Sequence, residues 1–152
     1  MEKEGQEKKA RQRKPKILVP IDASEVSDLV VKRTGQFIKL TGYEFDLTIL
    51  HVVEDVAHFE DVPKTPVYEE KVKKSQAVLE KAQKDLKGHG IDCDTKMTIG
   101  PIAAEVLRVA EEGKYNGIWI GSRGYGGIKR MLLGSVADNV IRHAHCSVVV
   151  VR

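Results

Sequence analysis

Gly121-Ser-Arg-Gly124 is followed by nine residues and then by Gly134-Ser135, and this glycine pattern is the most informative feature of the sequence. It follows the apolar run Gly117-Ile-Trp-Ile120 and precedes an amphipathic segment, which is the order strand, glycine loop, helix. Glycine permits positive φ and close approach of a ligand, because it has no Cβ. Free amides in such a loop and at the next helix start form a donor surface for phosphate. A glycine loop alone is weak evidence, but here the flanking strand, the helix and Ser135 at its entrance coincide.

The rest of the chain alternates between strand and helix patterns. Short apolar or alternating runs predict strands over residues 16–21, 45–53, 91–99, 117–121 and 147–151. Apolar residues at helical spacing predict helices over residues 24–41, 67–87, 101–113 and 135–144. This strict alternation predicts an α/β fold with a parallel sheet and helices on both faces, because parallel neighbours need long crossovers.

Particular residues define these elements further. Gly42 is expected to end the first helix, whose apolar stripe includes Phe37 and Leu40. Ile141 is expected to face inward from the last helix. The acidic segment 54–66 carries two prolines and has no clear period, so we expect a long, mobile loop there.

Length and charge bound the class of protein. A chain of 152 residues suits one domain, here residues 16–152. The net charge is +3, but residues 1–16 hold seven Lys or Arg against three Glu, so the remainder is close to neutral. Residues 1–15 have nothing to bury and are predicted to be a disordered basic tail. A solubilising role is favoured over an arm that binds nucleic acid or acidic lipid, because Glu is mixed in and no aromatic side chain is present.

The chain lacks targeting and cross-linking signals. No apolar stretch approaches the roughly 20 residues that span a bilayer, and the N-terminus lacks the apolar core of a signal peptide. We therefore expect a cytoplasmic protein without membrane partners. Cys93 and Cys146 have no metal or redox spacing and are expected to be small core residues rather than a disulfide.

A ligand in such a sheet binds beyond the carboxyl ends of the strands, where the strand order reverses. Backbone amides near Gly121, Gly124, Ser135 and Val136 are candidates to hold phosphates there. Asp22, directly after the first strand, suits ribose hydroxyls, although an Asp before Ala-Ser is equally a helix cap. Main-chain groups at Val52 are candidates to bind the base.

Other motifs are absent or ambiguous. The chain has no Gly-x-x-x-x-Gly-Lys-Ser/Thr P-loop, and no glycine fingerprint of a dehydrogenase follows the first strand. A metal site at His143-Ala-His145-Cys146 is disfavoured because no second ligand cluster exists. His51 is interpreted as a structural side chain rather than a general base. Arg123 is an even choice between phosphate binding and a solvated surface, and a solvated surface is favoured for Lys129 and Arg130.

The glycine motif, together with Val19-Pro-Ile-Asp22, Leu50-His-Val52 and the ending Cys146–Arg152, resembles the ATP-binding branch of the universal stress protein family. The resemblance covers about residues 16–152. It implies a doubly wound, five-stranded parallel sheet of order 3-2-1-4-5 that dimerises through the last strand. It also implies a bound ATP or other adenine nucleotide, with Mg²⁺ or Mn²⁺ on the phosphate oxygens.

The resemblance assigns roles to particular residues. Asp22 would bind ribose, the Val52 main chain would bind adenine, and Pro20 and Ile120 would line the pocket. The phosphates would lie on Gly121, Gly124, Gly134, Ser135 and Val136.

Three functions fit the sequence. The first is a nucleotide-dependent switch that binds ATP and, with little or no hydrolysis, alters a surface that partners recognise. The second is a slow ATPase, although neither a Walker lysine nor an assured base is present. The third is a chaperone-like dimer in which the glycines serve only the turn. The sequence favours the switch.

Overall fold

The computed structural model describes residues 14–54, 65–123 and 133–152. Strands and helices alternate along this part of the chain as predicted. In chain order the elements are β1 (Lys16–Ile21), α2 (Glu25–Thr41), β2 (Asp46–Val53), α3 (Pro66–Gly88), β3 (Asp94–Ile99), α4 (Ile102–Glu112), β4 (Gly117–Gly121), α5 (Ser135–His143) and β5 (Ser147–Val151). Residues 1–13 of the predicted tail and residues 55–64 of the predicted loop lie outside the described residues.

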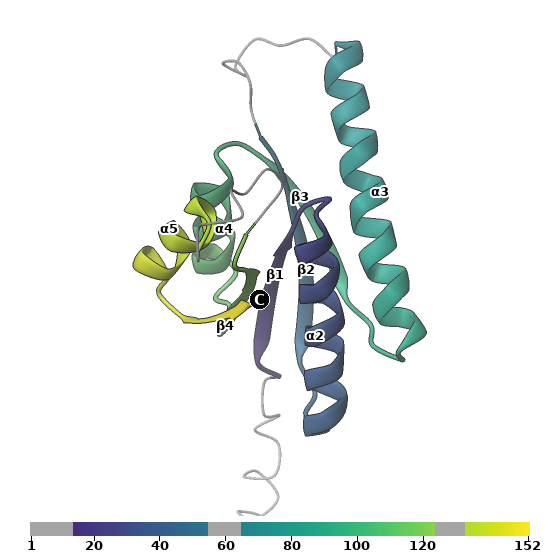
Figure 1. The fold of residues 1–152 in the computed structure, drawn as a ribbon, viewed down its shortest axis with the longest axis vertical. Helices are drawn as coiled ribbons and strands as arrows, with labels where there is room; N and C mark the ends of the chain where they lie inside the picture. Colours follow the sequence, from purple (N-terminus) through teal and green to yellow (C-terminus); the bar gives the residue numbers. More distant parts are fainter. Residues whose placement is uncertain (1–13, 55–64, 124–132) are drawn as a thin grey trace, which may run out of the picture.

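The five strands form one parallel sheet of order β3-β2-β1-β4-β5. Helices α2 and α3 cover one face, and α4 and α5 cover the other (Figure 1). The predicted doubly wound α/β fold is therefore confirmed. Among the described residues, no helix has both the length and the apolar character needed to cross a membrane.

Hydrophobic side chains pack on both faces of the sheet. Successive residues of a strand point to opposite faces, so Leu18 packs under α4 and α5 while Val19 packs under α2 and α3. Both side chains are fully buried. Continuous apolar burial of this kind is typical of the central strands of a parallel sheet.

The ends of the helices follow local chemistry. Ser24 caps α2 by accepting from the Ser27 amide at 3.2 Å, and Gly42 ends the helix with φ of 65°. After α3, Gly90 has φ of 76° and the Ile91 amide donates to the Leu86 carbonyl at 3.0 Å. This capping bond ties Ile91 to the helix, which is why β3 begins three residues later than predicted.

Three predicted core positions are wrong, and one of them is Phe37, which is 39% exposed. Leu40 is 87% exposed because it lies in the last turn of α2, and Ile141 is 42% exposed, although its neighbour Val140 is buried. The cysteines agree with their prediction, since both thiols are free and partly buried. Burial raises the pKa of Cys146 and raises that of Cys93 to about 11.

A pair of leucines tests this packing. Leu86 is a buried residue of α3 and is 1% exposed, so Leu86→Ala should lower the free energy of unfolding by about 2–5 kcal/mol through lost contacts and a residual cavity. Leu40→Ala should change it by less than about 0.5 kcal/mol. Urea unfolding followed by circular dichroism measures both, and equal losses would contradict the assignment of the core.

Candidate functional site

A crevice opens between β1 and β4 at the carboxyl ends of the strands. The chain adds β2 and β3 on one side of β1 and then β4 and β5 on the other, so the strand order reverses here. The register between β1 and β4 covers only Ile17 with Gly117 and Leu18 with Ile118. Two residues further along β1, Pro20 has no amide hydrogen with which to continue the ladder. The two strands therefore separate just where a ligand is expected.

The crevice widens into a cavity of about 380 Å³. All of the predicted site residues that the structure describes line it: Pro20, Asp22, Val52, Ile120, Gly121, Arg123, Gly134, Ser135 and Val136. The remaining one, Gly124, lies outside the described residues, as do Lys129 and Arg130. Segments from β1, β2, β4 and α5 thus converge on one hollow.

A second hollow, of about 710 Å³, lies beside the carboxyl end of α3. Lys84, Lys87, Asp92 and Cys93 are among its lining residues, and Lys87 is paired with Asp92 at 2.5 Å. It lies beside the start of β3, away from the carboxyl ends of the strands, and none of its lining residues begins a helix. The smaller cavity is therefore the candidate site.

The start of α5 forms one end of the cavity. Gly134 precedes the helix with φ of −76° and ψ of 160°, and no side chain in the described part of the chain caps the first turn. Ser135, Val136 and Ala137 are the first helical residues and all line the cavity. Amides in a first turn have no partner within the helix and carry the positive end of its dipole. This end of the cavity therefore suits an anion.

Gly121 and Gly134 have structural duties of their own. The Gly134 amide donates to the Ser122 carbonyl at 2.6 Å, which joins the end of β4 to the start of α5. A Cβ on Gly121 would lie 2.6 Å from Val26 Cγ1 and 3.2 Å from the Arg123 carbonyl oxygen. Neither glycine has a positive φ. Close packing, rather than left-handed backbone, therefore explains Gly121.

Asp22 lies in the cavity and is not the residue that caps α2. Ser24 holds the N-cap position, and the Asp22 carboxylate accepts through Oδ1 from the Ser24 amide at 2.8 Å. The Ser27 hydroxyl donates to the same oxygen at 2.7 Å. Asp22 thereby lines the cavity opposite the start of α5.

The backbone of Val52 is directed past the end of β1. The Asp46 amide donates to Pro15 on the β1 side of the strand, whereas the Val53 carbonyl accepts from Gly100 on the β3 side. Along a strand, the backbone amide and carbonyl groups of successive residues point to alternate sides. The amide and carbonyl of Val52 therefore point to the β1 side. The register with β1 ends at the pair Ile21 and His51, so the Val52 carbonyl lies beyond the ladder. It is positioned to accept from the polar edge of a base.

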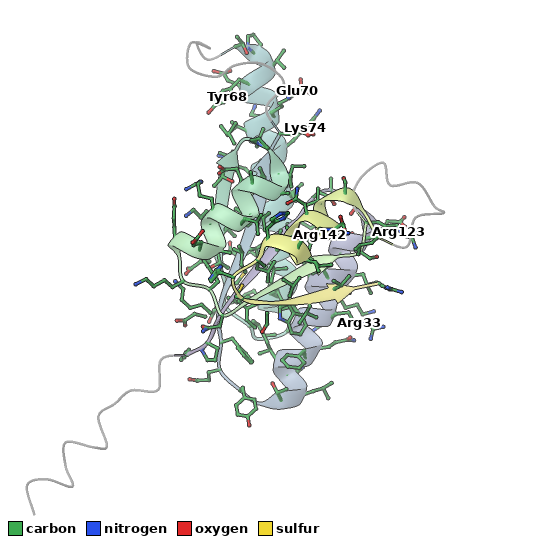
Figure 2. All side chains as sticks on the ribbon, turned by 90° about the vertical axis from the view of Figure 1, so that its left-hand side faces the viewer. Arg33, Tyr68, Glu70, Lys74, Arg123 and Arg142 are labelled. Carbon is green, nitrogen blue, oxygen red and sulfur yellow. The ribbon has the colours of Figure 1, made fainter. Side chains whose placement is uncertain are left out.

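Charged groups divide between the ends of the cavity. Arg123 lines it where the chain leaves β4 (Figure 2), on the side of the α5 amides. Glu54 lines it after β2, at the far side. Across the described residues, no three His, Cys, Asp or Glu side chains gather as metal ligands, His143, His145 and Cys146 included.

Sequence reasoning missed six of the residues that line the cavity: Ile21, Ser27, Leu50, Glu54, Ile102 and Ala137. Ser27 lies in a helix, where a serine looks like one more polar position. Glu54 follows Val52 by two residues and so shares its face of the sheet, which the strand period could have indicated. Ile102 reaches the site because α4 begins beside the end of β3, and this position depends on tertiary structure.

His51 supports the packing of α3 instead of lining the cavity. It points to the face opposite Val52, and its Nδ1 lies 2.7 Å from the hydroxyl oxygen of the fully buried Ser75. Burial lowers the pKa of His51 below its ordinary value of 6.5, and the charge of Asp22 partly offsets this effect. The interpretation of His51 as a structural side chain agrees with this contact.

The lowered pKa of His51 predicts a pH-dependent stability. The unfolded chain binds the His51 proton more tightly than the native protein, so the contribution of neutral His51 is complete above pH 6.5 and is lost as the pH falls toward the lowered pKa. Unfolding in urea between pH 7.5 and about 5, above the range where carboxylates titrate, should show a loss of stability that His51→Asn reduces. The same slope in both proteins would contradict the assignment.

Comparisons with known proteins agree with this geometry. MJ0531, a universal stress protein of Methanocaldococcus jannaschii, is 37% identical over 142 residues, which cover 90% of this chain and 81% of the relative. The solved structure of MJ0577 from the same organism superposes with a TM-score of 0.76 at 28% identity, covering 90% of this chain and 94% of that one. A universal stress protein solved in complex with cAMP superposes with a TM-score of 0.70 at 26% identity, covering 91% and 97%.

The model of the universal stress protein family matches residues 15–152, almost the whole chain. The strand order, the cavity at the reversal point and the relatives point the same way. The chain therefore belongs to the universal stress protein family.

Proposed function

We propose that this protein is an ATP-binding regulatory module that acts as a nucleotide-dependent switch in a stress response. The observation that carries the proposal is the convergence of Asp22 and the amides of Ser135 and Val136 on one cavity. Phosphate suits the α5 amides and Arg123, ribose hydroxyls suit the Asp22 carboxylate, and adenine suits the Val52 backbone. The cAMP complex of a similar protein supports adenine as the base.

We expect a divalent ion to bind on the phosphate oxygens of the nucleotide. Mg²⁺ prefers phosphate oxygens and water to a cage made only of protein groups. The described cavity residues include two carboxylates, Asp22 and Glu54, and no cluster of metal ligands. Mg²⁺ or Mn²⁺ would accordingly bind together with the nucleotide, on its phosphates. The ion and Arg123 would together offset the phosphate charge.

Hydrolysis has little support in the cavity. A general base must lie within hydrogen-bond reach of the attacking water. His51 points to the other face of the sheet and contacts Ser75. Among the described lining residues, the carboxylates of Asp22 and Glu54 are the remaining candidates, and our proposal assigns Asp22 to the ribose. Nucleotide binding without efficient turnover is therefore the better-supported function, and we propose that the protein acts in the cytoplasm.

We also propose a homodimer through β5. This strand is an edge of the sheet, and Val149 in its middle is 38% exposed. An unpaired apolar edge strand favours pairing with another strand. A second copy offers the same strand in a two-fold arrangement. Residues 16–152 would then form a single nucleotide-binding domain in each subunit.

Ser135 provides a sharp test of the phosphate site. Ser135→Pro removes the first amide of α5 but suits the first helical position, and the extended ψ of Gly134 is compatible with a following proline. We expect this variant to bind ATP about tenfold more weakly while adenosine binding is unchanged, because a donor to phosphate is lost. Isothermal titration calorimetry measures both affinities.

Ser135→Ala is the matched control, since it removes the hydroxyl and keeps the amide. It should lose less ATP affinity than Ser135→Pro. Failure of the unaltered protein to bind ATP with Mg²⁺ would refute the proposed function. Equal losses for ATP and adenosine would show that the phosphates lie elsewhere.

The dimer has a separate test. Val149→Glu places a charge in the proposed strand pairing and should convert the dimer to a monomer at micromolar concentration in sedimentation velocity. Val67→Glu, at a position 64% exposed on α3, should remain dimeric. Unaltered protein that sediments as a monomer would remove the dimer from the proposal and leave nucleotide binding intact.

A further inference from the structure

Ser27 makes two hydrogen bonds to the residue proposed to bind ribose. Its hydroxyl donates to Asp22 Oδ1 at 2.7 Å and accepts from the Asp22 amide at 2.8 Å. Ser27 lies in the first turn of α2, is 8% exposed and lines the cavity. One buried hydroxyl thus contacts both the backbone and the carboxylate of Asp22.

The start of α2 closes this arrangement. The Ser24 amide donates to Asp22 Oδ1 at 2.8 Å, and the Ser24 hydroxyl accepts from the Ser27 amide at 3.2 Å. Asp22 Oδ1 therefore receives two donors from one rigid helix start. A carboxylate held in this way has lost its rotamer freedom before any ligand arrives.

We propose that Ser27 is a positioning residue for ribose recognition, which fixes the Asp22 carboxylate in the orientation that accepts hydrogen bonds from the sugar hydroxyls. This inference rests on the proposed nucleotide-binding function and assigns it a selectivity for ligands that carry ribose hydroxyls. A carboxylate that must be ordered on binding would lose part of the affinity gained from those hydroxyls. Ser27 removes that cost.

Two other roles for Ser27 make different predictions. Capping of α2 belongs to the Ser24 hydroxyl, so removal of the Ser27 hydroxyl leaves the cap in place. Direct contact between Ser27 and the ligand would persist when Asp22 is absent. The effect of a positioning role would disappear when Asp22 is absent, because Ser27 would act only through the Asp22 carboxylate.

The experiment compares ATP with 2′,3′-dideoxy-ATP, which lacks the sugar hydroxyls, by calorimetry in the presence of Mg²⁺. The unaltered protein should prefer ATP. Ser27→Ala should weaken ATP binding about tenfold and dideoxy-ATP binding less than about twofold, since a charge-assisted hydrogen bond to the carboxylate is lost. Asp22→Ala should remove the preference, and adding Ser27→Ala to it should change neither affinity further.

Thr34→Val is the matched control. Thr34 is also a fully buried hydroxyl of α2, but it donates to the Val30 carbonyl and does not line the cavity. It should leave the preference for ATP unchanged. Thermal unfolding verifies that each variant is folded, and Ser27→Cys, of similar size with a weak donor, replaces Ser27→Ala if that variant is not.

The outcomes separate the two hypotheses. If the unaltered protein binds neither nucleotide, the proposed function fails and the role of Ser27 fails with it. If it prefers ATP and Ser27→Ala keeps the full preference, only the positioning role is overturned. A further loss in the double variant relative to Asp22→Ala overturns it as well, in favour of direct contact.

Discussion

The site depends on the early end of pairing between β1 and β4. Parallel strands gain a ladder of hydrogen bonds by staying together, and these two stop after Leu18 and Ile118. Pro20 lacks the amide hydrogen that further pairing needs, and beyond it the chain leads to opposite sides of the sheet from β1 and β4. A gap between two central strands is costly in a folded protein unless something fills it. Here the gap is a cavity lined by donors and acceptors.

Both sides of the cavity are held rigid by short-range hydrogen bonds. On the β4 side, the Gly134 amide joins the start of α5 to the Ser122 carbonyl. On the β1 side, Ser24 and Ser27 hold the Asp22 carboxylate. Donors for an anion and an acceptor for hydroxyls therefore line the same cavity. These groups have little conformational freedom left to lose when a ligand binds. Such preorganisation favours binding, because the ligand does not have to order the groups that recognise it.

The opposite face of the sheet serves helix packing and not the site. There His51 and Ser75 tie β2 to the long helix α3, whose first turns stand clear of the sheet (Figure 2). Val52, the next residue after His51, turns its side chain to the cavity face. Adjacent residues of one strand thus serve packing on one face and the site on the other, which is a direct result of the two-residue period of a strand.

The sequence alone was enough to predict the strands and helices and nine of the fifteen residues that line the cavity. The period of apolar residues located the strands and helices, and strict alternation is compatible with few arrangements other than a parallel sheet between helices. Single positions went wrong near the ends of helices: Leu40 lies in the last turn of α2, and Ile91 is hydrogen-bonded to the end of α3. The contacts of single residues followed only from the tertiary structure: Gly134 joins the start of α5 to Ser122, Ser24 rather than Asp22 caps α2, and Ser27 lines the cavity. Those contacts depend on atoms brought together from separate segments and on side-chain orientation, and neither is written in the spacing of residues along the chain.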